Sequence, residues 1–147
     1  MAEIAVGKGM PENGTIVSAQ FSIPYVVAAC IMDNELGPLQ LTEKRITDPA
    51  VLALSKKVFV KADEELNRIY PEKTSSRVEI LLKNGTKLTR QVDIPKGDPR
   101  DPMDAADLIQ KIIRFAVNRN KKGIEKLAAM IMDIENFKDI KCITDAI

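Results

Sequence analysis

Histidine and tryptophan are both absent from the 147 residues of this chain. Histidine is the side chain whose ordinary pKa lies nearest neutrality, and it is also the commonest metal ligand. Without it, proton transfer at neutral pH must rely on aspartate, glutamate, lysine or tyrosine with a shifted pKa. The absence argues against a self-contained hydrolase or metalloenzyme, and we expect neither a bound metal nor a cofactor.

Cysteine, excess charge and long apolar runs are also scarce. Cys30 and Cys142 are the two cysteines, without metal-ligand spacing, which fits a reducing compartment with Cys30 as a small core residue. The first eight residues lack the features of a secretion signal, so we expect a cytoplasmic protein. The 22 basic side chains nearly balance 21 acidic ones, and the longest apolar run is too short to cross a bilayer. We therefore expect no nucleic-acid or membrane partner.

That longest apolar stretch, residues 20–32, predicts a helix buried on most sides. Ser22 is placed to cap its first turn, and Pro24 falls in that turn, where its missing N–H costs nothing. Asn34 offers an exit from the helix. The rest of the chain is expected to be organised around this central helix.

The clearest β signal is a hairpin formed by residues 77–83 and 87–94. Asn84-Gly85 lies between them and supplies the positive φ values that a tight turn needs. We expect the apolar face of the hairpin to pack on the central helix, with Val58–Val60 as a third, buried strand. Ile4 and Val6 hint at one more short strand.

Helix signals surround this hairpin. Asp48 and Asp101 each precede a proline and are interpreted as N-caps of helices. The charged side chains of residues 43–45 are interpreted as a face exposed to solvent. Gly123 is interpreted as the break between two C-terminal amphipathic helices. Antiparallel strands with helices on one side give an α+β fold: a small antiparallel sheet with packed helices, followed by C-terminal helices.

Few residues qualify as candidates for chemistry. Tyr25, in the first turn of an apolar helix, needs a partner for its hydroxyl and is either an acid or donor in a cleft or a core tyrosine bonded to backbone. Lys96, in a rigid Pro/Gly loop, either grips an anion or is an ordinary turn residue. From the residues alone, the prediction is an α+β domain without a complete active site.

The order of several motifs resembles the MmgE/PrpD family, which includes 2-methylcitrate dehydratase, cis-aconitate decarboxylase and an iminodisuccinate epimerase. The matching blocks are Phe21-Ser22-Ile23-Pro24-Tyr25-Val26-Val27-Ala28-Ala29, Thr47-Asp48-Pro49-Ala50-Val51, Val58–Val60, Arg77-Val78-Glu79-Ile80, Leu82-Lys83-Asn84-Gly85, Pro95-Lys96-Gly97-Asp98-Pro99 and Pro102-Met103. They follow one another in the family's order from about residue 12 to the end.

The resemblance implies a larger enzyme with a helical domain, an α+β lid and an active site between them. Residues 1–96 would be part of the lid and residues 97–147 a C-terminal helical segment. Tyr25 is implied as a catalytic residue, and Ser22 and Lys96 as substrate-binding residues. The family's main acid/base groups would lie outside this chain, so we expect it to be inactive alone.

The resemblance implies that the chain is a C-terminal portion of a lyase or epimerase that acts on a small polycarboxylate. The favoured reaction is proton abstraction followed by loss of water, as in 2-methylcitrate dehydratase. Apolar side chains on the C-terminal helices would then meet a homo-oligomer partner or a separate chain that carries the helical domain. The alternative is a non-enzymatic module that self-associates or binds a carboxylate. Whether this chain is itself an enzyme stays open at this point.

Overall fold

The computed structural model describes residues 14–117 and 120–145, so the predicted strand at Ile4 and Val6 lies outside the described residues. Helices and a two-stranded antiparallel sheet make up the described chain, which is α+β as predicted. It divides into two compact units. One holds the described residues up to Lys61 and from Ala105 onward, and the other is Ala62–Asp104. The predicted boundary after residue 96 stays a prediction.

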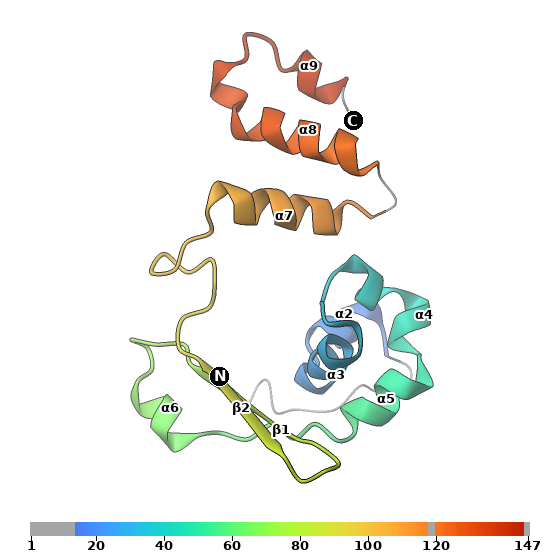
Figure 1. Cartoon of the computed structure of the whole chain (residues 1–147), viewed down its shortest axis with the longest axis vertical. Helices are drawn as coiled ribbons and strands as arrows, with labels where there is room; N and C mark the ends of the chain where they lie inside the picture. The colour runs from blue at the N-terminus through green and yellow to red at the C-terminus, as the bar shows by residue number, and fades with distance from the viewer. Residues whose placement is uncertain (1–13, 118–119, 146–147) are drawn as a thin grey trace. The chain divides into compact units, whose positions relative to one another are not determined.

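The N-terminal helices share one small core (Figure 1). These elements are α2 (Ile16–Gln20), α3 (Ile23–Asp33), the 3-10 helix η1 (Pro38–Leu41), α4 (Glu43–Ile46) and α5 (Pro49–Ser55). Helix α3 packs against both α2 and α5. The buried core residues are Ala19, Tyr25, Ala28, Ala29, Ile46 and Val51. Helices α2 and α5 thus share α3 as their packing partner.

Helix α3 has the ends that the sequence predicts. The Ser22 hydroxyl accepts a hydrogen bond from the Tyr25 N–H at 3.3 Å, and Pro24 lies in the first turn. Asn34 ends the helix in the left-handed conformation with φ 57°. The predicted burial on most sides is wrong, because Tyr25, Ala28 and Ala29 form one buried face. Each residue turns a helix by about 100°, which carries Cys30 off that face and exposes it, contrary to the core position predicted.

One helix cap, at Asp48, was predicted from the sequence, and another, at Thr15, was not. Asp48 caps α5 as predicted: its Oδ1 accepts from the Ala50 N–H at 2.8 Å. Thr15 caps α2 through a reciprocal capping box with Ser18, a helix that the sequence reading did not identify.

The C-terminal helices are α7 (Ala105–Phe115), α8 (Lys121–Met132), the 3-10 helix η2 (Ile134–Asn136) and α9 (Lys141–Thr144). Helix α7 packs on α8, and α8 packs on α9. The predicted break at Gly123 is wrong, because α8 already begins at Lys121. Asn120 caps this helix by accepting from the Lys122 N–H at 3.1 Å, and Gly123 is accommodated within the first turn. Neither these nor the other described helices are long and apolar enough to cross a membrane.

The second unit contains the predicted hairpin, formed by β1 (Ser76–Leu81) and β2 (Lys87–Val92). The Gly85 N–H donates to the Leu82 carbonyl at 3.0 Å, and the Leu82 N–H donates to the Thr86 carbonyl at 2.9 Å. Only Gly85, at φ 84°, takes a positive φ in this turn. The turn is therefore a type I turn followed by a glycine bulge, one residue longer than an Asn-Gly two-residue turn.

One face of the hairpin carries most of the apolar side chains of its two strands. The register pairs Ile80 with Leu88 and Val78 with Arg90 on one face, and Arg77 with Gln91 on the other. No residue of Ala62–Asp104, all of which the structure describes, is buried. The predicted packing of the apolar face on the central helix stays a prediction.

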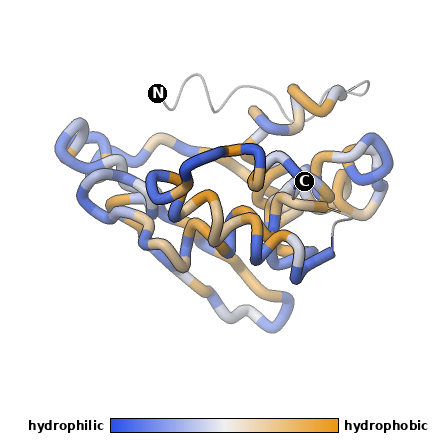
Figure 2. The backbone as a smooth tube through the Cα atoms, turned by 90° about the horizontal axis from the view of Figure 1, so that it is seen from above, coloured by the Kyte–Doolittle hydropathy of each residue, from blue (hydrophilic) through white to orange (hydrophobic). Residues whose placement is uncertain are grey.

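Polar contacts tie this unit together. Arg77 pairs with Asp63 at 3.0 Å and with Glu65 at 3.1 Å, linking β1 to α6 (Glu64–Arg68) and the cap before it. The Lys73 ammonium pairs with Asp93 at 2.9 Å. In Figure 2, apolar and polar segments alternate along the described part of the chain.

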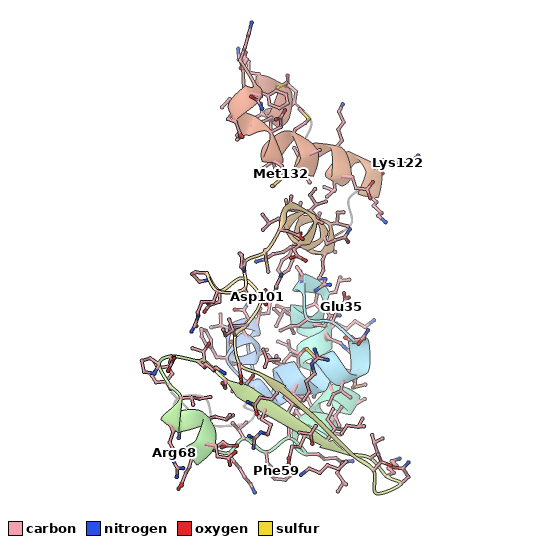
Figure 3. All side chains as sticks on the ribbon, turned by 60° about the vertical axis from the view of Figure 1, so that its left-hand side comes forward. Glu35, Phe59, Arg68, Asp101, Lys122 and Met132 are labelled. Atoms are coloured by element: carbon pink, nitrogen blue, oxygen red, sulfur yellow. The ribbon has the colours of Figure 1, made fainter. Side chains whose placement is uncertain are left out.

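Two further sequence predictions are wrong. Val58–Val60 is not a strand: the segment has no regular structure, and Phe59 is 81% exposed (Figure 3). A short apolar run forms a strand only where a partner strand takes up its backbone groups, and this segment pairs with no described strand.

Asp101 is not a helix cap, because α7 begins only at Ala105. The backbone of Asp101 belongs instead to a turn, where its N–H donates to Asp98 at 2.9 Å and its carbonyl accepts from Gly97 at 2.8 Å. Gly97 adopts φ 97°, which favours glycine at this position.

Candidate functional site

Tyr25 lies at the centre of the helical core. Its side chain is 0% exposed, and its hydroxyl donates to the backbone carbonyl of Gln40 at 2.5 Å. Burial raises the pKa of Tyr25, while the positive charge of Arg45 acts in the opposite direction. Tyr25 is therefore a neutral phenol at physiological pH, and its single proton is already shared with an acceptor from η1.

Gln40 anchors the turn that supplies this acceptor. Its side chain is almost fully buried: Oε1 accepts from the Gly37 N–H at 3.0 Å, and Nε2 donates to Asp33 Oδ2 at 3.1 Å. A buried amide satisfied on both sides is held in one orientation. The carbonyl facing Tyr25 is thus positioned by contacts of the Gln40 side chain with two residues that precede η1.

Arg45 joins the two aspartates at the ends of α3 and α5. Its Nε and Nη2 donate to the two oxygens of Asp33 at 3.1 and 2.5 Å, and its Nη1 donates to Asp48 Oδ2 at 2.6 Å. Its side chain is only 22% exposed. The prediction of a solvated face is wrong for this residue, because its guanidinium is taken up by carboxylates from two helices.

Hydrogen bonds stabilise the charged forms of both carboxylates. The hydrogen bond from Arg45 lowers the pKa of Asp33, although partial burial opposes it. Hydrogen bonds from backbone N–H groups at the start of α5, chiefly that of Ala50, lower the pKa of Asp48, and Arg45 adds to the effect. The cluster therefore remains an arginine between two anions at neutral pH.

Ser22 and Tyr25 are brought together by the first turn of α3. Ser22 is only 4% exposed, and its hydroxyl accepts from the Tyr25 N–H, so it acts as a helix cap. Neither side chain presents its hydroxyl at the surface of the described chain. Their roles in catalysis and substrate binding stay predictions.

Lys96 belongs to the other unit, in the loop before α7. Its side chain is half exposed, and its ammonium lies 3.2 Å from Asp101 Oδ1. In the same loop, hydrogen bonds from the side chain and backbone of Arg100 lower the pKa of Asp98 to about 2. This is an exposed, charged loop held by its own ion pairs, and substrate binding by Lys96 likewise stays a prediction.

Side chains of the metal-ligating types are scattered over the described part of the chain. Within residues 14–117 and 120–145, no three side chains of the metal-ligating types lie together. The chemistry available near Tyr25 is hydrogen bonding by a neutral phenol and charge provided by the guanidinium.

The sequence reading identified Tyr25 and Asp48 but missed Gln40, Asp33 and the pairing of Arg45. Arg45 lies twelve residues from Asp33, and the Tyr25 hydroxyl bonds a carbonyl fifteen residues away. One local signal was present: Arg45 stands three residues before Asp48, a spacing that allows an ion pair along a turn.

Comparison with known proteins places the chain in a family. The sequence model of the MmgE/PrpD C-terminal domain matches residues 2–135. Two curated relatives, both named cis-aconitate decarboxylase, come from Aspergillus terreus and from its strain NIH 2624 / FGSC A1156. Each is 23% identical over 136 residues, covering 89% of this chain and 28% of the relative.

The chain thus spans little more than a quarter of the length of these relatives, and the aligned part includes the helices around Tyr25 and the hairpin. The match over residues 2–135 covers nearly the whole chain and agrees with the order of motifs described above. We conclude that this chain belongs to the MmgE/PrpD family, with residues 2–135 corresponding to its C-terminal domain.

Proposed function

We propose that this chain contributes the C-terminal domain of a lyase that abstracts a proton next to a carboxylate of a small polycarboxylate. Loss of water from a hydroxy-tricarboxylate such as 2-methylcitrate is the reaction we favour. The observation that carries the proposal is the family match over residues 2–135. Decarboxylation is the second candidate, and it is favoured by the names of the two curated relatives.

The main acid/base groups are proposed to come from outside this chain. The chain contains no histidine, and the two tyrosines are its only phenols. The rest of the enzyme would be supplied by further sequence of the same polypeptide or by a separate chain, and the 147 residues alone are expected to be inactive.

Within this proposal Tyr25 is the catalytic residue, and Ser22 and Lys96 are the substrate-binding residues. For Tyr25 to donate a proton to a substrate, the substrate must replace the carbonyl of Gln40 as its acceptor, since the hydroxyl has one proton. A lysine ammonium in an exposed loop, as at Lys96, is a suitable partner for a carboxylate.

Apolar side chains on the C-terminal helices support association with a partner. Phe115 is 52% exposed and Ile131 is 41% exposed, and α7 has no buried residue among those described. We propose that a second copy or the rest of the enzyme covers them, and that the assembly is cytoplasmic. Size-exclusion chromatography with light scattering tests self-association directly.

The activity test uses the tagged chain to recover its assembly from the source cells. The assembly and the chain alone are then incubated with 2-methylcitrate, citrate and cis-aconitate, while water elimination and CO₂ release are followed separately. The proposal expects turnover by the assembly and none by the chain alone. A homo-oligomer of the bait that turns over none of these acids would contradict it and favour the non-enzymatic module.

Tyr25→Phe tests the residue assignment in the same assay, with Tyr70→Phe as the matched control. Tyr70 is 53% exposed and no role is assigned to it. Loss of turnover in Tyr25→Phe with retained assembly supports a catalytic role. Unchanged turnover in both variants would remove Tyr25 from the site.

A further inference from the structure

We propose that Gln40 and Arg45 are positioning residues for Tyr25, which hold its hydroxyl against η1 and set how readily that hydroxyl is released. The inference deepens the proposed function and rests on its assignment of Tyr25 as a site residue. The inference concerns how easily the Tyr25 hydroxyl becomes accessible. This accessibility can be measured on the chain without any enzymatic turnover.

The first step is the hydroxyl itself. Tyr25 is 0% exposed, and its proton is committed to the Gln40 carbonyl at 2.5 Å. No other acceptor gains that proton unless η1 moves away from the ring. Release of the Tyr25 hydroxyl is therefore equivalent to a local opening of Pro38–Leu41.

The second step is the anchorage of η1. The side chain of Gln40 bonds the Gly37 N–H on one side and the Asp33 carboxylate on the other, at 3.0 and 3.1 Å. These two contacts hold both the start of the turn and its link to the end of α3. An opening of η1 must break them or carry Asp33 along.

The third step is the fixation of Asp33. Arg45 donates to both of its oxygens through Nε and Nη2, and through its third nitrogen, Nη1, to Asp48, the residue that caps α5. The planar fork of arginine matches a carboxylate in two places at once, which lysine cannot do. Because Arg45 of α4 holds Asp33 and also bonds the cap of α5, the start of α5 is connected to the Tyr25 hydroxyl through these hydrogen bonds and through Gln40 itself.

The test follows the reactivity of Tyr25 towards N-acetylimidazole, which acetylates exposed tyrosine hydroxyls. Tyr70→Phe makes Tyr25 the sole tyrosine of the chain, and peptide mass spectrometry measures its acetylation. Arg45→Met is compared with Arg68→Met in this background. Arg68 also forms an ion pair, with Glu64, but at 3.9 Å and on the surface.

We expect Arg45→Met to accelerate acetylation of Tyr25 by about tenfold or more, because charge-assisted hydrogen bonds change a local equilibrium by that factor. Helical circular dichroism should be retained, and the acceleration should be insensitive to low concentrations of urea, as expected of local opening. Arg45→Lys should give a smaller acceleration, and Arg68→Met none. Gln40→Met should resemble Arg45→Met.

Two results would overturn the proposal. One is an unchanged acetylation rate in both Arg45→Met and Gln40→Met. The other is acceleration that rises with urea as steeply as global unfolding, which is the behaviour of residues that merely stabilise the fold. If Arg45→Met does not fold, Arg45→Lys and Gln40→Met decide the question. Failure of Tyr25 in catalysis is detected separately, by the Tyr25→Phe activity assay, and leaves these rates unaffected.

Discussion

Replacing Tyr25 with phenylalanine removes one buried oxygen and keeps the ring, so the apolar contacts of the core are retained. What is lost is the hydrogen bond to the Gln40 carbonyl, which leaves that acceptor in η1 with one partner fewer. A buried polar group deprived of its partner costs about 1–3 kcal/mol. We expect Tyr25→Phe to lower the free energy of unfolding by about 1.5 kcal/mol within that range.

Urea unfolding followed by far-ultraviolet circular dichroism at pH 7 measures this change, because the helices around Tyr25 contribute to the helical signal. On heating, the same loss corresponds to a fall in Tm of roughly 3–6 °C for a chain of this size. Tyr70→Phe is the matched control: Tyr70 is 53% exposed, and its substitution should change stability by less than about 0.5 kcal/mol. Equal urea midpoints for the two variants would refute a stabilising hydrogen bond at Tyr25.

Three further predictions follow from the same contacts. Ser22→Ala removes the cap of α3 and should lower the free energy of unfolding by about 1 kcal/mol in urea titrations, and an unchanged midpoint would contradict the cap. Val51→Ala empties part of a fully buried site and should cost about 1–3 kcal/mol, whereas Val17→Ala, at a position 61% exposed, should cost far less. Hydrogen bonds, first of all from Lys73, lower the pKa of Asp93 from 3.8 to about 2. Because this folded-state pKa lies below the unfolded-state value, the contribution of Asp93 to stability is complete above pH 3.8 and is lost as the pH falls through about 2. NMR titration of the Asp93 carboxylate should show the low midpoint, Lys73→Met should move it upward, and an ordinary midpoint in the unsubstituted chain would contradict the contact.

The signals that predicted structure correctly are short-range ones. Asp48 followed by Pro49, and Asn84 followed by Gly85, act within one turn of chain, so their effect depends little on what packs nearby. Even here the structure refined the result, since the hairpin uses a positive φ at Gly85 alone. Local backbone chemistry therefore determined where α5 begins and where the hairpin turns.

The predictions that failed depended on distant partners. Val58–Val60 has strand-like side chains but no described strand beside it, and Asp101 resembles a cap while its backbone serves a turn with Gly97 and Asp98. Cys30 lies in an apolar helix, yet burial reaches only the face that carries Tyr25. In each case the side chain is of a type that suits the predicted strand, helix cap or core position. The structure actually formed depends on residues that pack or pair with it, and these cannot be identified from the residue type alone.

The sequence by itself determined the α+β class, the hairpin, the caps of α3 and α5, and a resemblance to the MmgE/PrpD family that the family match confirms. Only the tertiary structure decided what the Tyr25 hydroxyl bonds to and that Arg45 joins Asp33 to Asp48. The physical reason is range: caps and turns are closed by backbone groups a few residues away, whereas these contacts exist only once α3, η1, α4 and α5 have packed together.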